Sequence, residues 1–261
     1  RVNIFSDKPG AVRAVDMLMK KMKGEEFETE LPMPVFTHVE PVLGIILDEA
    51  TIAVITTGGI VPWGNPDSLK ASNADRFLSY NIENIDNLKE GEYQTVHGGY
   101  DPVYANEDPD RILPLDVLKE LESEKAFKKL YNEYFVTVGN TTAVSNARKF
   151  GEDIAERLLN DGVDGVILTS TWGTDTRCGA TMVKYIEKAG IPAVHICAIT
   201  NISETVGANR IVPAVAIPHP TGNPEFSKDE EYVLRKNLIK KALEALETDI
   251  NEQTLFKGVK V

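Results

Sequence analysis

The sequence has little cysteine and no long apolar run, and both absences exclude classes of protein. Only two cysteines, Cys178 and Cys197, occur in 261 residues, which is too few for a disulfide framework and indicates a reducing compartment. Apolar runs such as 52–55 and 211–217 are far shorter than the roughly 20 residues that a membrane-spanning helix needs. We therefore expect a cytoplasmic protein without a transmembrane segment.

Basic residues are also scarce relative to acidic ones. The chain has 28 Lys and Arg against 40 Asp and Glu, a formal charge of −12, and such a surface repels nucleic acid and anionic membranes. The first residues lack the pattern of a signal sequence, and there is no initiator Met. We expect neither a nucleic-acid nor a membrane partner, and we expect the chain to be a fragment or a processed product.

What the chain does contain is an alternation of short apolar runs with amphipathic stretches. This pattern predicts an α/β fold with a mostly parallel sheet flanked by helices, Rossmann-like in type, because short apolar runs without polar alternation suit strands covered on both faces. The expected strands are 52–56, 134–138, 165–169, 192–198 and 211–217, and the expected helices are 12–22, 143–160, 179–189 and 228–247.

The segment 61–110 is rich in Pro, Gly, Asn and Asp and predicts long loops and short turns near the active rim of the sheet. No interdomain linker or internal repeat is evident. We expect one α/β unit over 1–261, with a possible small amino-terminal lobe over 1–50.

Ligands of open parallel sheets bind where the strands end at their carboxyl edge. This rule brings together five segments that lie far apart in the chain. They are 56–59, 139–142, 170–178, 195–197 and the loop at His219.

Cys178 lies near the expected start of the helix after strand 165–169. Unpaired amides and the helix dipole favour a thiolate there, and Arg177 would add to the effect, so we expect a lowered pKa of the thiol. The alternative is a buried, inert cysteine.

The histidines are the other candidates for chemistry. His195 and Cys197 share one face of an expected strand and could act as base and nucleophile, or as metal ligands, but no second ligand pair accompanies them, so we predict no metal site. Core packing is the alternative. His97 lies in a Gly-rich loop and could swing over a substrate, with a solvent-exposed turn as the alternative. His219 lies between two prolines in a rigid loop that would hold the imidazole with little conformational freedom, with a strand-terminating turn as the alternative.

Gly58 and Gly59 follow a strand and could let backbone amides approach a carboxylate or phosphate. The pattern is neither a Walker loop nor a three-glycine dinucleotide fingerprint, so we predict no nucleotide cofactor.

Several longer motifs together resemble one family, the selenoprotein B subunit of the glycine, sarcosine and betaine reductases. The resemblance runs from about residue 50 to 247 and is carried by Thr57-Gly-Gly-Ile-Val-Pro62, Gly64-Asn-Pro66, His97-Gly-Gly-Tyr-Asp-Pro-Val-Tyr-Ala-Asn-Glu-Asp108, Val138-Gly-Asn140, Val166-Ile-Leu-Thr-Ser-Thr171, Arg177-Cys-Gly-Ala-Thr-Met-Val183 and Val206-Gly-Ala-Asn-Arg-Ile-Val-Pro213. Members of the family carry a longer amino-terminal portion, so this chain resembles the carboxyl-terminal part.

The resemblance implies a cytoplasmic, oligomeric enzyme of anaerobic amino-acid fermentation. Its partners would be a pyruvoyl-bearing component B subunit and a small selenoprotein A. A selenolate would attack the alpha carbon of glycine, sarcosine or betaine, release the amine and leave a carboxymethyl group that passes to selenoprotein A.

The family motif places selenocysteine, then cysteine three later, then cysteine three later again. Here these positions are Trp172, Asp175 and Cys178. The selenocysteine codon UGA differs by a single base from the tryptophan codon, so Trp172 has a simple explanation as a stand-in for selenocysteine. Asp175 has no such explanation, because its codon is two changes from a cysteine codon.

Two hypotheses follow. In the first, the natural chain is a reductase subunit with residue 172 as the nucleophile, Cys178 as a redox partner, and His195 or His97 as a proton donor. In the second, Trp172 and Asp175 are native, and the protein is a divergent subunit that binds a small carboxylate or regulates without reductase activity. The expected substrate-binding residues are Thr57, Gly58, Gly59, Arg177 and Arg210, and an aromatic cage for a quaternary amine could use Trp63, Tyr100 and Tyr104.

Overall fold

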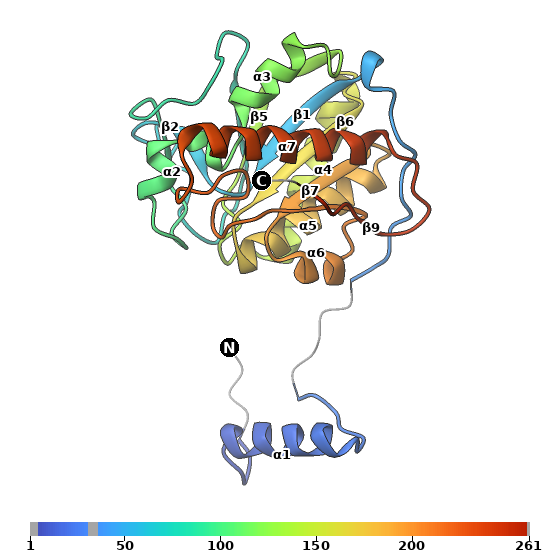
Figure 1. Cartoon of the computed structure of the whole chain (residues 1–261). Coiled ribbons are helices and arrows are strands. Elements are labelled where there is room, and N and C mark those ends of the chain that lie inside the picture. Colours follow the sequence, from blue (N-terminus) through green and yellow to red (C-terminus); the bar gives the residue numbers. More distant parts are fainter. Residues whose placement is uncertain (1–4, 31–35, 260–261) are drawn as a thin grey trace. The chain divides into compact units, whose positions relative to one another are not determined.

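A seven-stranded sheet organises most of the chain (Figure 1), and the computed structural model describes residues 5–30 and 36–259. Its strand order is β3-β5-β1-β6-β7-β8-β9, and every neighbouring pair is parallel except β3 with β5. The strands are β1 (Thr51–Thr56), β3 (Leu78–Asn81), β5 (Lys129–Val136), β6 (Gly165–Ser170), β7 (Ala193–Cys197), β8 (Arg210–Pro213) and β9 (Thr254–Leu255).

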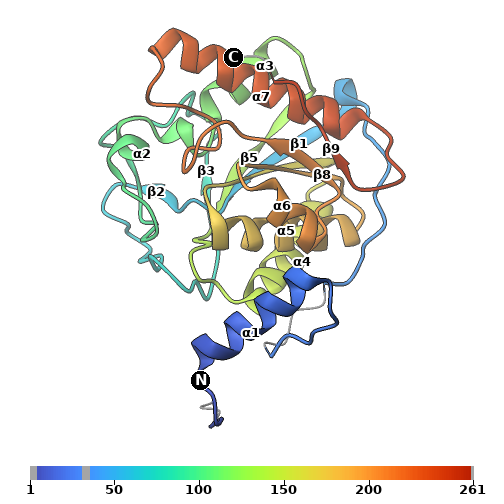
Figure 2. The same cartoon turned by 60° about the horizontal axis from the view of Figure 1, so that its bottom comes forward.

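Helices cover both faces of the sheet. Helix α4 (Val144–Asn160) packs on α5 (Gly173–Lys188), and α5 packs on α6 (Thr200–Val206); α3 (Leu115–Ser123) packs on α7 (Lys228–Glu247). Figure 2 shows the first three on one side of the sheet and the other two on the opposite side. The predicted Rossmann-like α/β fold is confirmed.

Burial explains why the central strands form. All six residues of β6 and all five of β7 are buried, as expected for parallel strands covered on both faces. Helix α7 has the bounds predicted from its periodicity. It begins with a capping box in which Ser227 and Glu230 satisfy each other's exposed backbone amides.

Three predicted elements differ clearly from the structure. The strand predicted at 134–138 is β5, which begins five residues earlier at Lys129 and ends at Val136. Helix α5 begins at Gly173, six residues before the expected start at Gly179, because the polar residues 174–177 hide its first turns from an apolar-periodicity argument. The last predicted strand ends at Pro213, and residues 214–217 form an irregular loop.

The segment 61–110 is mostly irregular, as expected, but contains short elements. They are β2 (Ile60–Pro62), which pairs with β4 (Tyr93–Thr95), the edge strand β3, helix α2 (Val103–Glu107) and the 3-10 turn η2 (Pro109–Arg111). A further 3-10 turn, η1 (Leu47–Glu49), precedes β1.

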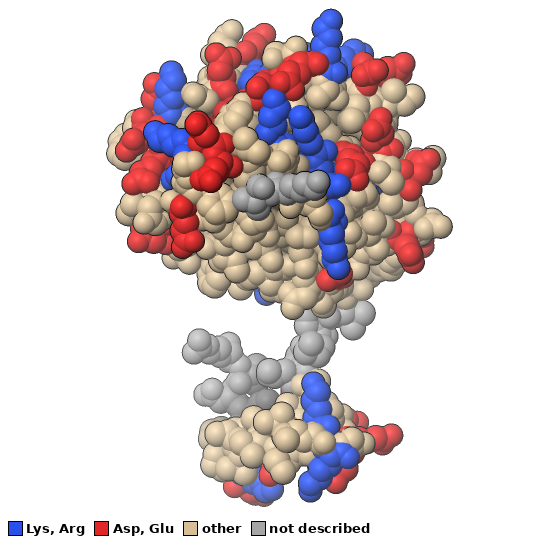
Figure 3. All heavy atoms as spheres, viewed as in Figure 1, with Lys and Arg blue, Asp and Glu red and all other residues tan. Residues whose placement is uncertain are grey.

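The chain divides into two compact units, Arg1–Phe36 and Thr37–Val261. The division falls at residue 36, so residues 37–50 belong with the sheet. The first unit contains helix α1 (Gly10–Lys23). In the part of the chain that is described, none of the helices is both long and apolar enough to cross a membrane. Figure 3 shows acidic side chains spread over the face it presents, with basic side chains among them.

Candidate active site

The sheet has a switch point between β1 and β6. The chain goes from β1 to β3 and β5 on one side, whereas it goes from β6 to β7 on the other, and the carboxyl ends at such a point are where open α/β sheets commonly bind ligands. Residues 57–59 follow β1, and Thr171 and Trp172 follow β6. The topology therefore places the glycine-rich turn 57–59 and the segment that begins at Thr171 together.

The backbone of Thr57, Gly58 and Gly59 is buried and already hydrogen-bonded within the chain. The amide of Thr57 donates to the Thr169 carbonyl at 3.1 Å, that of Gly58 to the Thr56 hydroxyl at 3.1 Å, and that of Gly59 to the Thr137 carbonyl at 3.1 Å. The expectation that these amides are available to a substrate carboxylate is therefore wrong for this conformation. The lack of a side chain at Gly58 lets Ile112 pack closely against this turn, since an added Cβ would lie 2.4 Å from Ile112 Cγ2.

His97 is fixed in a loop that closes over the end of β1. Its Nδ1 accepts a hydrogen bond from the Gly99 amide at 3.1 Å, and its ring stacks on Tyr100 with centroids 4.7 Å apart. The Tyr100 hydroxyl in turn donates to the Gly58 carbonyl at 3.0 Å. The His97 side chain is fully buried, so the alternative of a solvent-exposed turn is wrong for this residue.

Trp172 is the N-cap residue of α5 and lies against this loop. A Cβ added to Gly99 would lie 2.7 Å from Trp172 Nε1 and 2.8 Å from His97 Cε1, so the indole and the imidazole both border Gly99. Trp172 Nε1 is buried and has no hydrogen-bond partner among the described residues. Position 172 and His97 are thus in one site.

Asp175 joins them from the first turn of α5. Its Oδ2 accepts hydrogen bonds from the Thr171 amide at 2.6 Å and the Thr171 hydroxyl at 2.8 Å, and the positive end of the helix dipole favours a carboxylate there. Its Oδ1 lies 3.5 Å from His97 Nε2, and both side chains are fully buried. Gly139 makes room for Oδ1, because an added Cβ would lie only 1.9 Å from that oxygen.

Cys178 has the opposite electrostatic environment from the one expected. Because α5 begins at Gly173, Cys178 lies in the second turn, away from the unpaired amides of the helix start, and it is buried. Burial raises the pKa of its thiol, and the charge of Asp175 adds to the increase. The expectation of a lowered thiol pKa is wrong, and the alternative of a buried thiol describes Cys178 better.

His195 belongs to a separate buried network. Its Nε2 lies 2.8 Å from Ser170 Oγ and its Nδ1 lies 2.8 Å from Ser203 Oγ, and Ser170 Oγ lies 2.8 Å from Thr57 Oγ1. Gly179 leaves space for this chain, since a Cβ there would lie 2.1 Å from Ser170 Oγ. Burial lowers the pKa of His195 to about 3. The network is fully satisfied, so His195 stabilises the fold as a neutral side chain.

This lowered pKa makes folding stability depend on pH. Between 6.5 and about 3 the unfolded chain binds a proton at His195 and the folded chain does not, so stability falls as pH falls, by about 1.4 kcal/mol per pH unit. Urea unfolding of wild type and His195→Gln at several pH values should give a smaller slope for the variant. His38→Gln, at an exposed position, is the control. Equal slopes in wild type and His195→Gln would contradict the assignment.

Cys197 and His219 do not join the Trp172 site. Cys197 is buried, and burial raises the pKa of its thiol to about 12. Burial and the charge of Arg111 lower the pKa of His219 to about 4. Its ring packs edge-on to that of Tyr104, with the ring centroids 6.1 Å apart. Across residues 5–30 and 36–259, no cluster of His, Cys, Asp and Glu is arranged to hold a metal ion.

Of the two predicted arginine clamps, Arg177 reaches the rim segment 139–142, whereas Arg210 lies at the opposite edge of the sheet. Arg177 Nη2 donates to the Thr142 carbonyl at 2.9 Å, and its Nε is buried without a partner among the described residues. Arg210 lies at the amino end of β8, the edge opposite the rim, where it donates to Glu187 at 2.7 Å and to the carbonyls of Val42, Ala245 and Thr248. The prediction that Arg210 binds substrate at the rim is therefore corrected.

Of the three aromatic residues considered for a cage, only Tyr100 lies at the site. Trp63 is 57% exposed and Tyr104 is 49% exposed, and Tyr104 contacts His219. Sequence reasoning missed Gly99, Gly139 and Thr171, which shape the site. Their only sequence signal was membership of the glycine-rich and strand-end motifs.

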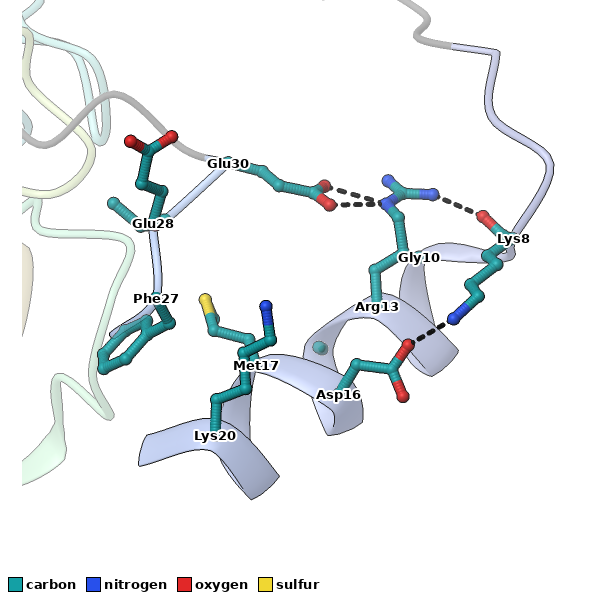
Figure 4. A pocket seen from close by; sticks show the side chains of 11 residues that line it. Lys8, Gly10, Arg13, Asp16, Met17, Lys20, Phe27, Glu28 and Glu30 are labelled. Atoms are coloured by element: carbon teal, nitrogen blue, oxygen red, sulfur yellow. Dashed lines mark hydrogen bonds and ion pairs between the residues drawn. The ribbon is translucent and has the colours of Figure 1, made fainter. Parts of the chain in front are cut away.

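A hollow in the amino-terminal unit is unrelated to these residues. It measures about 450 Å³ and is lined by residues of α1 and by 27–30 (Figure 4). Arg13 Nε donates to Glu30 at 2.7 Å across it, and Lys8 pairs with Asp16 at 2.8 Å. None of the predicted site residues lines this hollow.

Comparison with known proteins decides the family. A family model described as glycine/sarcosine/betaine reductase selenoprotein B matches residues 1–171, ending one residue before Trp172. The chain is 58% identical over 257 residues to the glycine reductase complex component B subunit gamma of Carboxydothermus hydrogenoformans, covering 98% of this chain and 59% of that protein. The chain belongs to this family.

Two relatives from Peptoclostridium acidaminophilum carry other substrate names. The sarcosine reductase complex component B subunit beta is 48% identical over 99% of this chain and 59% of the relative, and the betaine reductase complex component B subunit beta is 48% identical over 96% and 57%. The chain thus spans less than two thirds of the length of these relatives. No solved structure matches it.

Proposed function

We propose that this chain is part of a component B subunit of an amino-acid reductase that acts on glycine, sarcosine or betaine. The observation that carries the proposal is the meeting of residue 172 with His97 and Asp175 at the switch point of the sheet, where open α/β folds bind ligands. The membership of the selenoprotein B family supports it.

In this proposal the natural residue 172 is selenocysteine. Its selenolate attacks the alpha carbon of the substrate, a carbon–selenium bond forms as the carbon–nitrogen bond breaks, and the amine leaves with the electron pair. A pyruvoyl group on a partner subunit would activate a primary or secondary amine. The carboxymethyl group then passes to selenoprotein A. We place this oligomeric assembly in the cytoplasm of an anaerobic organism.

A second candidate is favoured by the way Asp175 is built into the structure. Its carboxylate accepts two hydrogen bonds from Thr171, and Gly139 leaves space for it. The surrounding residues therefore suit an aspartate at position 175. The candidate is a divergent subunit in which Trp172 and Asp175 are native. It binds a small carboxylate, or regulates the complex, without reductive cleavage.

The deciding experiment has two parts. The native gene is sequenced at codons 172 and 175 and the mass of the native protein is measured at these residues, and the activity of the subunit is then assayed. The full subunit would be prepared with selenocysteine and with tryptophan at residue 172, and each would be mixed with the partner components and with glycine, sarcosine or betaine. The proposal expects selenium in the native protein and amine release from the selenocysteine form alone. The second candidate would be established by three results together. They are a native tryptophan at residue 172, binding of a small carboxylate, and no release of amine from any of the three substrates.

A further inference from the structure

Two contacts together favour one tautomer of the His97 ring, and the first is the hydrogen bond to its Nδ1. The donor is the backbone amide of Gly99, 3.1 Å away, and an amide can only donate. Nδ1 must therefore present its lone pair, so the neutral ring carries its proton on Nε2. A doubly protonated ring would set two N–H groups against each other at Gly99.

The proton on Nε2 faces a carboxylate. Asp175 Oδ1 lies 3.5 Å from Nε2, longer than an ordinary hydrogen bond, and both atoms are buried without another partner among the described residues. Trp172 Nε1 is a third buried polar atom without a partner, and it borders the same glycine as the His97 ring. Two N–H donors and one carboxylate oxygen thus gather where residue 172 lies.

Asp175 is held rigidly enough to orient its neighbour. Two hydrogen bonds from Thr171 fix Oδ2, and the backbone of Gly139 packs against Oδ1. The carboxylate therefore cannot rotate away from His97 without losing both bonds to Thr171. The ring of His97 is held from its other side by stacking on Tyr100.

We propose that Asp175 is a positioning residue, which fixes His97 as a neutral hydrogen-bond donor through Nε2 beside residue 172. The inference deepens the proposed function and rests on it for the identity of the reacting position. It assigns the second position of the motif an electrostatic role in this chain, where the family motif has a thiol. The Nε2–H of His97 then points to Asp175 Oδ1, and the carboxylate holds the ring in one orientation beside residue 172.

The test is the protonation pattern of the His97 ring, measured by long-range ¹H–¹⁵N NMR on the whole chain labelled at histidine. His97→Gln identifies the signal among the four histidines. At pH 7 we expect an unprotonated Nδ1 and a protonated Nε2 in wild type. Asp175→Ala should give a mixture of tautomers or an exchange-broadened signal, and Asp175→Asn, which keeps an oxygen acceptor, should restore much of the wild-type pattern.

The control is Asp153→Ala, at an exposed position of α4, which should leave the His97 signal unchanged. An imidazolium or an Nδ1-protonated ring in wild type would overturn the proposal. So would an Asp175→Ala chain that is folded, by its amide spectrum, and has the wild-type His97 pattern. Because this readout needs no turnover, it can succeed or fail independently of the amine-release assay for the proposed function.

Discussion

In the double variant Trp172→Cys/Asp175→Cys, oxidation should form an intramolecular disulfide between residues 172 and 175. Residue 172 is the N-cap of α5 and residue 175 lies in its first turn, the spacing at which Cys-X-X-Cys pairs at helix starts are bridged. Positions three apart around a helix start lie on one face, so two cysteines there can come within the Cα separation of about 4.4–6.8 Å that a disulfide accepts.

The single variant Trp172→Cys should form no bridge to Cys178. Six helical residues rise about 9 Å, beyond the reach of a disulfide, and Cys178 lies buried in the second turn. Peptide mass mapping of the oxidised chains, in a Cys197→Ser background, measures both outcomes. A 172–178 bridge in the single variant would show that the first turn of α5 unwinds readily, which the proposed role of Cys178 as a redox partner requires.

Gly139→Ala should destabilise the protein by about 3 to 5 kcal/mol, at the upper end of what single substitutions do. The new methyl would lie 1.9 Å from Asp175 Oδ1 and 2.8 Å from Asp175 Cα, so either the carboxylate or the start of α5 must move. The backbone of Gly139 does not have a positive φ, so the expected loss of stability comes from the steric clash and not from backbone strain. Urea unfolding at pH 7 measures the free energy.

Two further variants show whether Asp175 is the cause. Gly173→Ala, in the first turn of the same helix, places its methyl in open space and should change stability by less than about 1 kcal/mol, in the stabilising direction. In an Asp175→Ala background the cost of Gly139→Ala should fall by at least about 1 kcal/mol, although the contact with Cα persists. An unchanged cost would mean that Asp175 is not what fills the space at Gly139.

The sequence was sufficient for the outline of the site. The buried apolar runs at 52–56 and 165–169 predict parallel strands, and the carboxyl ends of parallel strands meet at one rim. For this reason residues 57–59 and 172 could be expected near each other before the structure was known, whereas His97 was placed only within the loop segment 61–110 near the rim. The helix 228–247 could be placed to the residue from its periodicity, and the structure adds a capping box at its start.

Local patterns failed where long-range partners decide the outcome. The polar residues 174–177 conceal the first turns of α5, so Cys178 was expected at a helix start and lies instead in a buried second turn. Arg210 has the charge that a carboxylate clamp needs, but strand register places it at the opposite edge, bound to Glu187.

By itself, the sequence determined the class of fold and the family, because these depend on residue identity and on spacing along one strand or helix. Only the tertiary structure decided the chemistry available at the candidate site. In the structure, the amides of 57–59 are hydrogen-bonded within the chain, and His195 belongs to a separate network with Ser170. The His97 ring lies beside the Asp175 carboxylate. These outcomes depend on which buried polar groups find partners, and those partners come from segments that are distant in the chain.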